Sequence, residues 1–490
     1  MDYKLKLVGK IDLSPRPNND SFSLSNQKGN GFRLLSMSVS FGSLKTVSFD
    51  FGVLLDEGYS DYRFFSLLIG NNGVGKSSLL REIVDFFIDA NNGKNTRSKS
   101  NLNITSLSYE LDNVKYRIDK DRNLFKYYKN ELIVKRSEVI VPLIIATTSG
   151  MFDKFPIKKK TTNDKEDRYN VSFYKYVGPK VNNNMFMSKT NQMLQHLSAM
   201  NTIRHKNQLT RIAKLLNVIG YEAELAISYK VKNIDDPNLK SKSYNISSEC
   251  KNFLGRLSPE HIQDGKILFK SSTLDEVRQM HLSEIYELRQ NNLLSSFKCF
   301  FFRDNKSIDC NNLSSGEFNM LSIVMSVILS TEDSNALILL DEPEISQHPN
   351  WQRDMIYILD DALVDNNCHF LIATHSHLLV SNLPMNRSSV IHMEKHEDSV
   401  KISPIEATTY GWSPEEVLLK VFMMTTDRNK YLAEMLGSFI KEISENNISI
   451  DDAHNKLAFL NKVSEGMSEV DPIKMIIKTI TEEFRRNGRY

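Results

Sequence analysis

The pattern of apolar and polar positions changes near residue 70. FFSLLIG, residues 64–70, is an apolar run that ends in glycine, as expected of a buried parallel strand. From Ser77 the spacing becomes helical, with one apolar face made of Leu79, Leu80, Ile83, Phe86 and Phe87. The pattern therefore predicts a strand, a glycine-rich turn and an amphipathic helix in direct succession.

The rest of the chain divides by the same criterion. Residues 1–70 and 101–145 carry short alternating segments separated by turns, which predicts strands. Residues 313–395 alternate between apolar runs and helical spacing, as in an α/β fold with a parallel sheet. Residues 150–300 show helical patterns with polar breaks, without sustained heptads or a repeat. After residue 406 the pattern is helical, and we expect helices within 426–446, 451–464 and 470–486.

Composition narrows the class of protein only slightly. The 490 residues suffice for two to four domains, and a net charge of +2 gives no reason to expect nucleic acid as a partner of the whole chain. The cysteines form no C-x-x-C pair, which argues against a structural zinc site and suits a reducing compartment. We find no signal peptide and no apolar stretch of roughly 18 residues, so we expect a cytoplasmic protein without a membrane partner.

The turn after the first buried strand carries a phosphate-binding pattern. Residues 70–78, GNNGVGKSS, fit G-x-x-x-x-G-K-[ST] between a strand and a helix. In such a P-loop, backbone amides wrap the phosphates, the lysine neutralises the β/γ oxygens and the hydroxyl can bind Mg²⁺. The alternative is an ordinary glycine turn. The predicted ATP-binding residues here are Gly70, Asn71, Asn72, Gly73, Val74, Gly75, Lys76, Ser77 and Ser78.

Two acidic residues follow a later buried strand, ALILLDEPE, residues 336–344. Asp341 ends the strand, where the carboxyl ends of parallel strands meet ligands, and with Ser77 it would hold Mg²⁺. Glu342 follows it and is placed to polarise the attacking water. The alternative is a strand that ends in an acidic turn.

A third strand ends in a histidine. FLIATHSH, residues 370–377, places His375 about 30 residues after Asp341, where a γ-phosphate sensor is needed. A neutral imidazole can donate one hydrogen bond to that phosphate, although a lone histidine is more often structural. A second candidate phosphate site lies in NNLSSGEFNML, residues 311–321, at the start of a predicted helix. Its candidate residues are Ser314, Ser315, Gly316 and Glu317.

In this order, the P-loop, LSSGE, LLDEPE and ATHS resemble the ABC-type ATPase heads, in particular the RecF/SMC and OLD-like branch. DEPEISQHP, residues 341–349, resembles the OLD-like ATPases at the D-loop position, the segment after the second acidic residue. The resemblance implies Mg-dependent ATP hydrolysis with catalytic roles for Glu342 and His375. It also implies a dimer in which Ser315 and Gly316 face the ATP held by the other subunit's Lys76. One departure is the glutamine loop, for which the strand 141–150 offers Thr147, Thr148 and Ser149 but no glutamine.

The resemblance also implies a domain division and a fold class. The class is α/β, an ABC-ATPase head with a mixed or parallel core sheet, a helical insertion and a helical C-terminal region. The expected division is 1–150 with the P-loop, a helical or mixed insertion at 151–305, the signature and acidic motifs at 306–405, and the C-terminal region at 406–490.

The sequence offers no nuclease of its own. We find neither a Toprim domain nor an H-N-H constellation, so we expect ATP hydrolysis without cleavage of nucleic acid. This absence resembles the ATPase subunits of two-component anti-phage systems, such as Septu and the retron-associated ATPases, which act with a separate nuclease. Either the helical tail docks that partner or it covers the ATPase core. Its candidate apolar residues are Val417, Leu418, Val421, Phe422, Leu432, Leu436, Phe439 and Ile440.

The charge is uneven along the insertion. Residues 171–221 contain no Asp or Glu, and aromatic residues lie between the basic residues at the start of this stretch. Such a stretch can contact the phosphate backbone of DNA or RNA, although a run of charge is usually a solvated face. Its basic residues are Lys175, Lys180, Lys189, Arg204, Lys206, Arg211 and Lys214.

Three hypotheses of function remain open from the sequence. The first is an ABC-type ATPase that dimerises around ATP and regulates an associated effector nuclease in anti-phage defence. The second is a RecF-like repair ATPase whose main partner is DNA. A transporter subunit is the least favoured, because the segment between the P-loop and the signature is far too long and nothing indicates membrane coupling.

Overall fold

A computed structural model provides the structure of this protein. It describes residues 31–41, 46–51, 63–93, 102–121, 124–150, 153–158, 167–182, 185–200, 206–233, 246–258, 261–331, 335–363, 367–384, 386–396, 399–405, 409, 411–422, 430–445, 447–465, 467 and 471–486. The predicted strands before residue 31, and Arg204 of the basic stretch, lie outside these residues.

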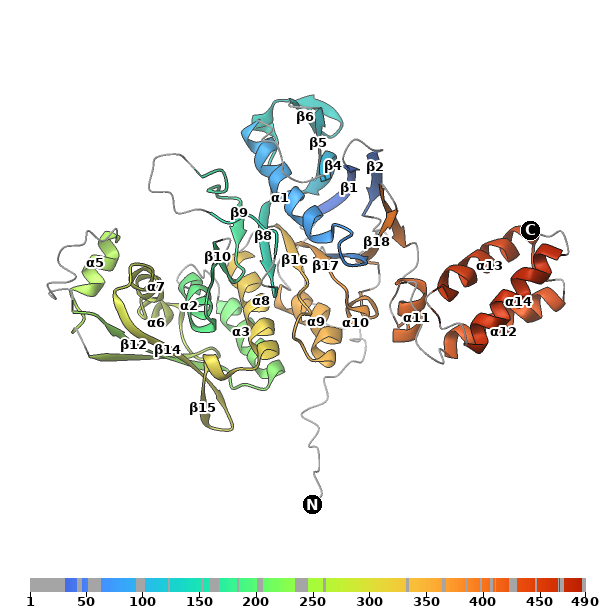
Figure 1. Ribbon diagram of the computed structural model, residues 1–490. Coiled ribbons are helices and arrows are strands. Elements are labelled where there is room, and N and C mark those ends of the chain that lie inside the picture. The colour runs from blue at the N-terminus through green and yellow to red at the C-terminus, as the bar shows by residue number, and fades with distance from the viewer. Residues whose placement is uncertain are drawn as a thin grey trace, which may run out of the picture.

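A seven-stranded sheet with the order β19-β18-β3-β17-β16-β8-β9 lies at the centre of the molecule (Figure 1). Neighbouring strands are parallel except β18 and β19. The strands are β3 (Phe64–Gly70), β8 (Leu143–Thr148), β9 (Tyr174–Tyr176), β16 (Ala336–Asp341), β17 (His369–Ala373), β18 (Ser388–His396) and β19 (Ser399–Ile405). The predicted mixed α/β core is therefore confirmed.

Both faces of this sheet are buried because the side chains of its inner strands alternate between two cores. Phe65 and Leu67 of β3 belong to one hydrophobic cluster, whereas Leu68 belongs to the other. The helices that follow or cover the strands are α1 (Lys76–Asn92), α2 (Lys189–Ala199), α3 (Lys206–Ile219), α8 (Ser315–Thr331), α9 (Pro349–Ala362) and α10 (His377–Val380). The strand–turn–helix predicted for residues 64–92 is present as β3 and α1.

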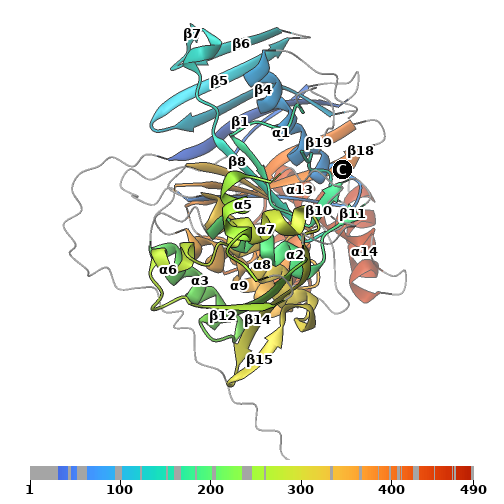
Figure 2. The ribbon, with the colours of Figure 1, turned by 90° about the vertical axis from the view of Figure 1, so that its left-hand side faces the viewer.

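A six-stranded antiparallel sheet packs over α1 and one face of the central sheet (Figures 1 and 2). Buried His369 of β17 joins the two sheets, since its Nδ1 accepts a hydrogen bond from the Leu34 amide at 2.9 Å and its Nε2 lies 2.8 Å from Ser66 Oγ. The strands are β1 (Phe32–Phe41), β2 (Thr46–Asp50), β4 (Leu102–Leu111), β5 (Val114–Asp121), β6 (Leu124–Lys129) and β7 (Leu132–Val134), followed by the 3₁₀ turn η1 (Arg136–Glu138).

The insertion contains a sheet as well as helices. Its four antiparallel strands have the order β13-β12-β14-β15, and β12 alternates between buried and half-buried residues because only one face is covered (Figure 2). The strands are β12 (Glu224–Val231), β13 (Ile262–Leu268), β14 (Leu294–Arg303) and β15 (Lys306–Asp309). The remaining elements are β10 (Lys180–Asn182), β11 (Met185–Phe186), α5 (Ser248–Leu254), α6 (Leu274–Arg278), α7 (Leu282–Gln290) and η3 (Cys310–Asn312). The helical patterns of the sequence thus account for only part of this region.

The C-terminal helices form a module with its own hydrophobic cluster, at the right of Figure 1. They are α11 (Pro414–Lys420), α12 (Lys430–Ser444), α13 (Ile450–Ser464) and α14 (Pro472–Arg486), and the last three lie inside the predicted ranges, apart from Ile450, which is one residue earlier than expected. Most apolar residues named for partner docking are buried inside the protein: Val417, Val421, Leu432, Leu436 and Phe439. Ile440 is exposed. None of the helices in the described part of the chain is long and apolar enough to cross a membrane.

Candidate nucleotide site

The P-loop is shaped by glycines with backbone angles that other residues rarely adopt. Gly73 and Gly75 have φ angles of 79° and 107°, and α1 begins immediately afterwards at Lys76. Gly70 is fixed by packing, since a Cβ there would lie 2.2 Å from the carbonyl oxygen of Met393. Asn71, Asn72 and Gly73 are exposed at the tip, whereas Val74 is buried. This turn places backbone amides and the N-terminus of α1 at the carboxyl end of the sheet.

Lys76 lies buried at the centre of the site. Its Nζ donates to the carbonyl oxygen of Gly70 at 2.8 Å and lies 2.7 Å from Nε2 of His375. Burial lowers the pKa of Lys76 to about 8, against the attraction of Glu342 and Asp341. Burial and the Lys76 charge both lower the pKa of His375. Both pKa shifts are consistent with a neutral His375 whose Nε2 accepts a hydrogen bond from the Lys76 ammonium group.

Ser77 and Asp341 meet beside this lysine. The Ser77 hydroxyl donates to Oδ1 of Asp341 at 2.9 Å. Burial raises the pKa of Asp341 to about 7, opposed by the Ser77 hydrogen bond. Such a carboxylate favours a nearby cation, and Mg²⁺ is usually held by one or two protein oxygens with phosphates and water. The donor set thus fits Mg²⁺ bound together with a nucleotide.

Glu342 turns out of β16 in a left-handed conformation, with a φ of 48°. Its amide donates to the carbonyl oxygen of Ala373 at 2.8 Å, which holds the turn against β17. Its Oε1 lies 3.7 Å from Nε2 of His375, and the side chain is 37% exposed. The carboxylate can therefore reach both solvent and His375, the predicted γ-phosphate sensor, which we call the switch histidine. Such access is what a base that activates water requires.

Glu344 is a site residue that the sequence reasoning missed. Its Oε1 accepts hydrogen bonds from the Thr374 hydroxyl and the His375 amide, each at 2.8 Å. Burial raises its pKa, and its Oε2 has no hydrogen-bond partner among the described residues. The carboxyl group thereby fixes the backbone that carries His375. The sequence signal was the third acid of DEPE, to which the sequence reasoning gave no role.

The residues at the expected glutamine-loop position support the backbone after β16. The Thr148 hydroxyl donates to the carbonyl oxygen of Asp341 at 2.9 Å, and the Ser149 hydroxyl donates to that of Pro343 at 3.0 Å. Asp153, five residues after Thr148, is buried and accepts a hydrogen bond from the Tyr176 hydroxyl at 2.8 Å. Its charge contributes to the raised pKa of Asp341. Sequence reasoning did not single out this aspartate, because no local motif marks it.

The signature motif begins α8 with a capping box. The Ser314 amide donates to Glu317 Oε2 at 2.8 Å, and the Glu317 amide donates to Ser314 Oγ at 3.2 Å. Burial alone would raise the pKa of Glu317, but hydrogen bonds from Arg303, Ser314 and Tyr221 hold it at about 2. The Glu317 carboxylate is therefore engaged within its own subunit, whereas Ser314 and Ser315 are exposed.

The structure gathers five of the predicted residues at the carboxyl ends of β3, β16 and β17: Lys76, Ser77, Asp341, Glu342 and His375. The hydroxyl of Ser78 accepts a hydrogen bond from Lys154 instead, at 2.7 Å. Within the described part of the chain, none of the hydrogen bonds of residues 314–317 reaches the P-loop. The signature therefore makes no direct hydrogen bond to the P-loop of its own chain among the described residues.

The basic stretch 171–221 makes many contacts within the chain. Lys175 donates to the carbonyl oxygen of Ser330 at 3.2 Å, and Lys189 to that of Leu313. Lys180 donates to the carbonyl oxygen of Asp153 at 3.0 Å, and Lys214 lies 3.4 Å from the Asp361 carboxylate. Each of these lysines thus makes a contact within the chain, and binding of a nucleic acid backbone here stays a prediction.

Comparison with known proteins found a family match, a relative similar over part of the chain, and distantly similar solved structures. A family profile described as an AAA ATPase domain matches residues 40–380. The Septu protein PtuA of Bacillus thuringiensis is 26% identical over 162 residues, which is 32% of this chain and 39% of that protein, so the match spans well under half of this relative. Among solved structures, an SMC head bound to the C-terminal winged-helix domain of ScpA aligns with 76% of this chain and 98% of its own at 11% identity, with a TM-score of 0.38. The SMC head domain from Thermotoga maritima aligns with 76% of this chain and all of its own at 10% identity, with a TM-score of 0.35.

Proposed function

This chain belongs to the AAA ATPase domain family, and on that premise we propose that it binds ATP with Mg²⁺ and hydrolyses it in an ABC-type dimer. The observation that carries the proposal is the cluster of Lys76, Ser77, Asp341, Glu342 and His375 at one edge of the sheet. Bound Mg²⁺ would neutralise charge on the β- and γ-phosphates.

Each residue of the cluster has a distinct role in this proposal. Lys76 binds the β/γ-phosphates, and its contact with His375 must break or rearrange when phosphate enters. Ser77 and Asp341, whose side chains are hydrogen-bonded to each other, would hold the metal. Glu342 takes the proton of the attacking water, and His375 then donates to the γ-phosphate. Glu344 positions His375 by binding its amide.

The dimer is proposed from the arrangement of the signature. Ser314 and Ser315 are exposed at the N-terminus of a 17-residue helix, and no hydrogen bond among the described residues joins residues 314–317 to the P-loop of the same chain. A helix N-terminus attracts phosphate, since its first amides lack intrahelical partners. We therefore assign Ser315, Gly316 and the start of α8 to the ATP that a second copy holds, with Ser314 and Glu317 supporting the cap.

The likeness to Septu protein PtuA, which covers only part of both chains, supports our proposal for the biological role. We propose that the dimer regulates a separate effector nuclease in anti-phage defence. The C-terminal module offers exposed apolar side chains for such a partner: Ile440, Ile450, Met475 and Ile476. The alternative, a RecF-like repair ATPase, would bind DNA as its main partner.

The test of the ATPase dimer is Glu342→Gln, which keeps the shape of the side chain and removes the base. The variant should bind ATP normally, lose turnover by at least about 100-fold as expected for a general base, and accumulate as a dimer in the presence of Mg·ATP. Size-exclusion chromatography with light scattering and a phosphate-release assay measure both effects. Unchanged turnover would remove Glu342 as the base, and a monomer that hydrolyses ATP at the full rate would overturn the shared site.

Co-purification from the native operon separates the two biological roles. A nuclease that elutes with the ATPase is expected for the effector role. A solitary chain that binds DNA tightly, with affinity that falls steeply as salt rises, would contradict that role and support the repair alternative.

A further inference from the structure

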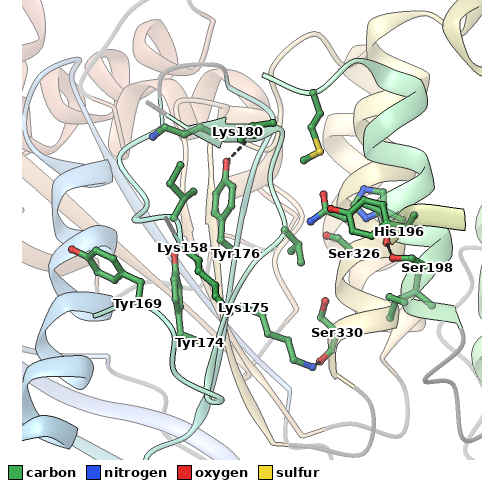
Figure 3. A pocket seen from close by; sticks show the side chains of 18 of the residues that line it. Lys158, Tyr169, Tyr174, Lys175, Tyr176, Lys180, His196, Ser198, Ser326 and Ser330 are labelled. Carbon is green, nitrogen blue, oxygen red and sulfur yellow. Dashed lines mark hydrogen bonds between the residues drawn. The ribbon is translucent and has the colours of Figure 1, made fainter. Parts of the chain in front are cut away.

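A cavity of about 960 Å³ lies between β9, α2 and the C-terminal half of α8 (Figure 3). Its volume is at the upper end of the range of roughly 300–1,000 Å³ found for small-molecule sites. None of the residues of the P-loop, the acidic motif or the switch lines it. The cavity is therefore separate from the candidate ATP site, although Ser326 and Ser330 belong to the same helix as the signature.

The charged groups of the cavity all have one sign. Lys158, Lys175 and Lys180 line it, and none of its described lining residues is Asp or Glu. Figure 3 shows Lys175 reaching across the cavity toward Ser330, whose carbonyl oxygen accepts its hydrogen bond at 3.2 Å. Asp153 and Asp85 contact lining tyrosines from outside the cavity, and Asp153 is buried and engaged by Tyr176 and Lys180. A cavity of this kind favours an anion.

Aromatic rings form the rest of the same wall. Tyr169, Tyr174 and Tyr176 are anchored through their hydroxyl groups, which donate to Asp85, to the carbonyl oxygen of Pro156 and to Asp153 respectively. Burial raises the pKa of each phenol, so the hydroxyl groups stay protonated. With their polar ends held by the protein, the rings leave carbon surface for a flat, apolar ligand group. Tyr286 adds a fourth ring from α7.

The helical wall supplies neutral polar groups. His196 lies 2.8 Å from the Ser322 hydroxyl, and burial lowers its pKa to about 4, so that it is uncharged at neutral pH. Gln195 also lines the cavity, and its Oε1 has no hydrogen-bond partner among the described residues. Buried acceptors without a partner are uncommon in native proteins, and a rotation of the Gln195 amide would present this shielded oxygen to a ligand amino group.

We propose that this cavity is a second ligand site that takes a phosphorylated nucleotide unit, with the phosphate toward Lys158 and Lys175 and the base against the tyrosines and Gln195. Positive charge, aromatic surface and an unmet amide acceptor are the groups that such a ligand needs. A free mononucleotide and the 5′-phosphorylated end of a strand share this chemistry. The inference does not depend on ATP hydrolysis at the P-loop.

The test uses the full chain carrying Lys76→Ala, so that the P-loop cannot contribute to the binding signal. The probes for isothermal titration calorimetry are AMP, dTMP, and tetrathymidylate with either a 5′-phosphate or a 5′-hydroxyl. We expect saturable binding of at least one phosphorylated probe, with about one site per chain, and weaker binding of 5′-hydroxyl tetrathymidylate. Mononucleotides that bind as tightly as the phosphorylated strand indicate a free nucleotide, and a clear preference for that strand indicates a strand end.

Two substitutions and a control place the ligand in the cavity. Lys158→Met, at an exposed position, and Lys175→Met should each weaken binding by about tenfold or more, as expected for a lost hydrogen bond to a charged group. Lys214→Met removes a lysine of the same basic stretch that does not line the cavity, and it should bind as before. The proposal is wrong if no probe gives saturable binding, or if Lys158→Met binds as tightly as Lys214→Met.

Discussion

Gly316, the second residue of α8, touches the D-loop more closely than any other residue type allows. A Cβ at this position would lie 2.5 Å from the carbonyl oxygen of Ser346 and 3.4 Å from Cα of Gln347, and both are backbone atoms. The D-loop cannot readily move away, since Ser346 already has a φ of 62° and Asn319 of α8 donates to the carbonyl oxygen of Ile345 at 3.1 Å. Gly316→Ala therefore forces α8 and the D-loop apart.

Gly437 provides a matched control for this substitution. It lies exposed in α12, and a Cβ there would meet no atom within 4 Å. Both substitutions gain the helix propensity of alanine, about 0.5–1 kcal/mol, so that Gly437→Ala should be slightly stabilising. The difference between the two variants isolates the steric overlap, which we place at about 1–3 kcal/mol from the usual cost of overpacking.

Thermal unfolding and ATP turnover measure the effect. If the chain melts as one unit, a difference of 1 kcal/mol corresponds to roughly 1 °C in a protein of this length, so Gly316→Ala should melt about 1–3 °C below Gly437→Ala. Turnover should fall up to about 100-fold in Gly316→Ala alone, because the start of α8 is displaced by a fraction of an ångström to an ångström. The reasoning is refuted if both variants melt together and turn over ATP at the wild-type rate.

Three further predictions concern the nucleotide site. Burial raises the pKa of Asp341 to about 7, so its carboxylate is increasingly protonated below that pH. The affinity for Mg²⁺, measured by calorimetry in the presence of ADP, should therefore fall as the pH drops from 8 to 6. An affinity that stays constant over this range contradicts the assignment of Asp341 as a metal ligand. Lys76→Ala should abolish binding of a fluorescent ATP analogue, and normal affinity would refute the P-loop site. Ser315→Arg should leave ATP binding intact and abolish turnover, since it blocks the exposed start of α8; full turnover would remove the signature from the active site.

The local motifs could be predicted from the sequence because each is a strand, a turn and a helix in succession. The P-loop, Asp341, Glu342 and His375 follow this rule, and their strands lie side by side as parallel neighbours. The sheet of the insertion could not be assigned in the same way. Residues such as Leu225 and Phe301, which pair between β12 and β14, are separated by helices whose pattern dominates the sequence.

The positions that sequence reasoning missed depend on packing between distant segments. Asp153 matters because Tyr176 and Lys180 approach it, and Glu344 matters because its carboxyl group meets the Thr374 hydroxyl and the His375 amide. No spacing in the chain encodes such contacts. Glu317 was also a candidate nucleotide-binding residue. Its carboxylate accepts hydrogen bonds from Ser314, Tyr221 and Arg303 of its own chain, and its role at the nucleotide stays a prediction.

The D-loop, residues 343–349, lies between the two halves of the proposed site. On one side it receives α8, through the close approach of Gly316 and the hydrogen bond from Asn319 to the Ile345 carbonyl oxygen. On the other side Glu344 binds the amide of His375, whose imidazole contacts Lys76. When the start of α8 binds ATP held by a second subunit, it can therefore shift the D-loop, which is already hydrogen-bonded to His375. Binding of the second subunit can in this way change the Lys76–His375 contact. For this reason Gly316→Ala should reduce turnover, although it alters none of the residues that contact the ATP bound in the P-loop of the same chain.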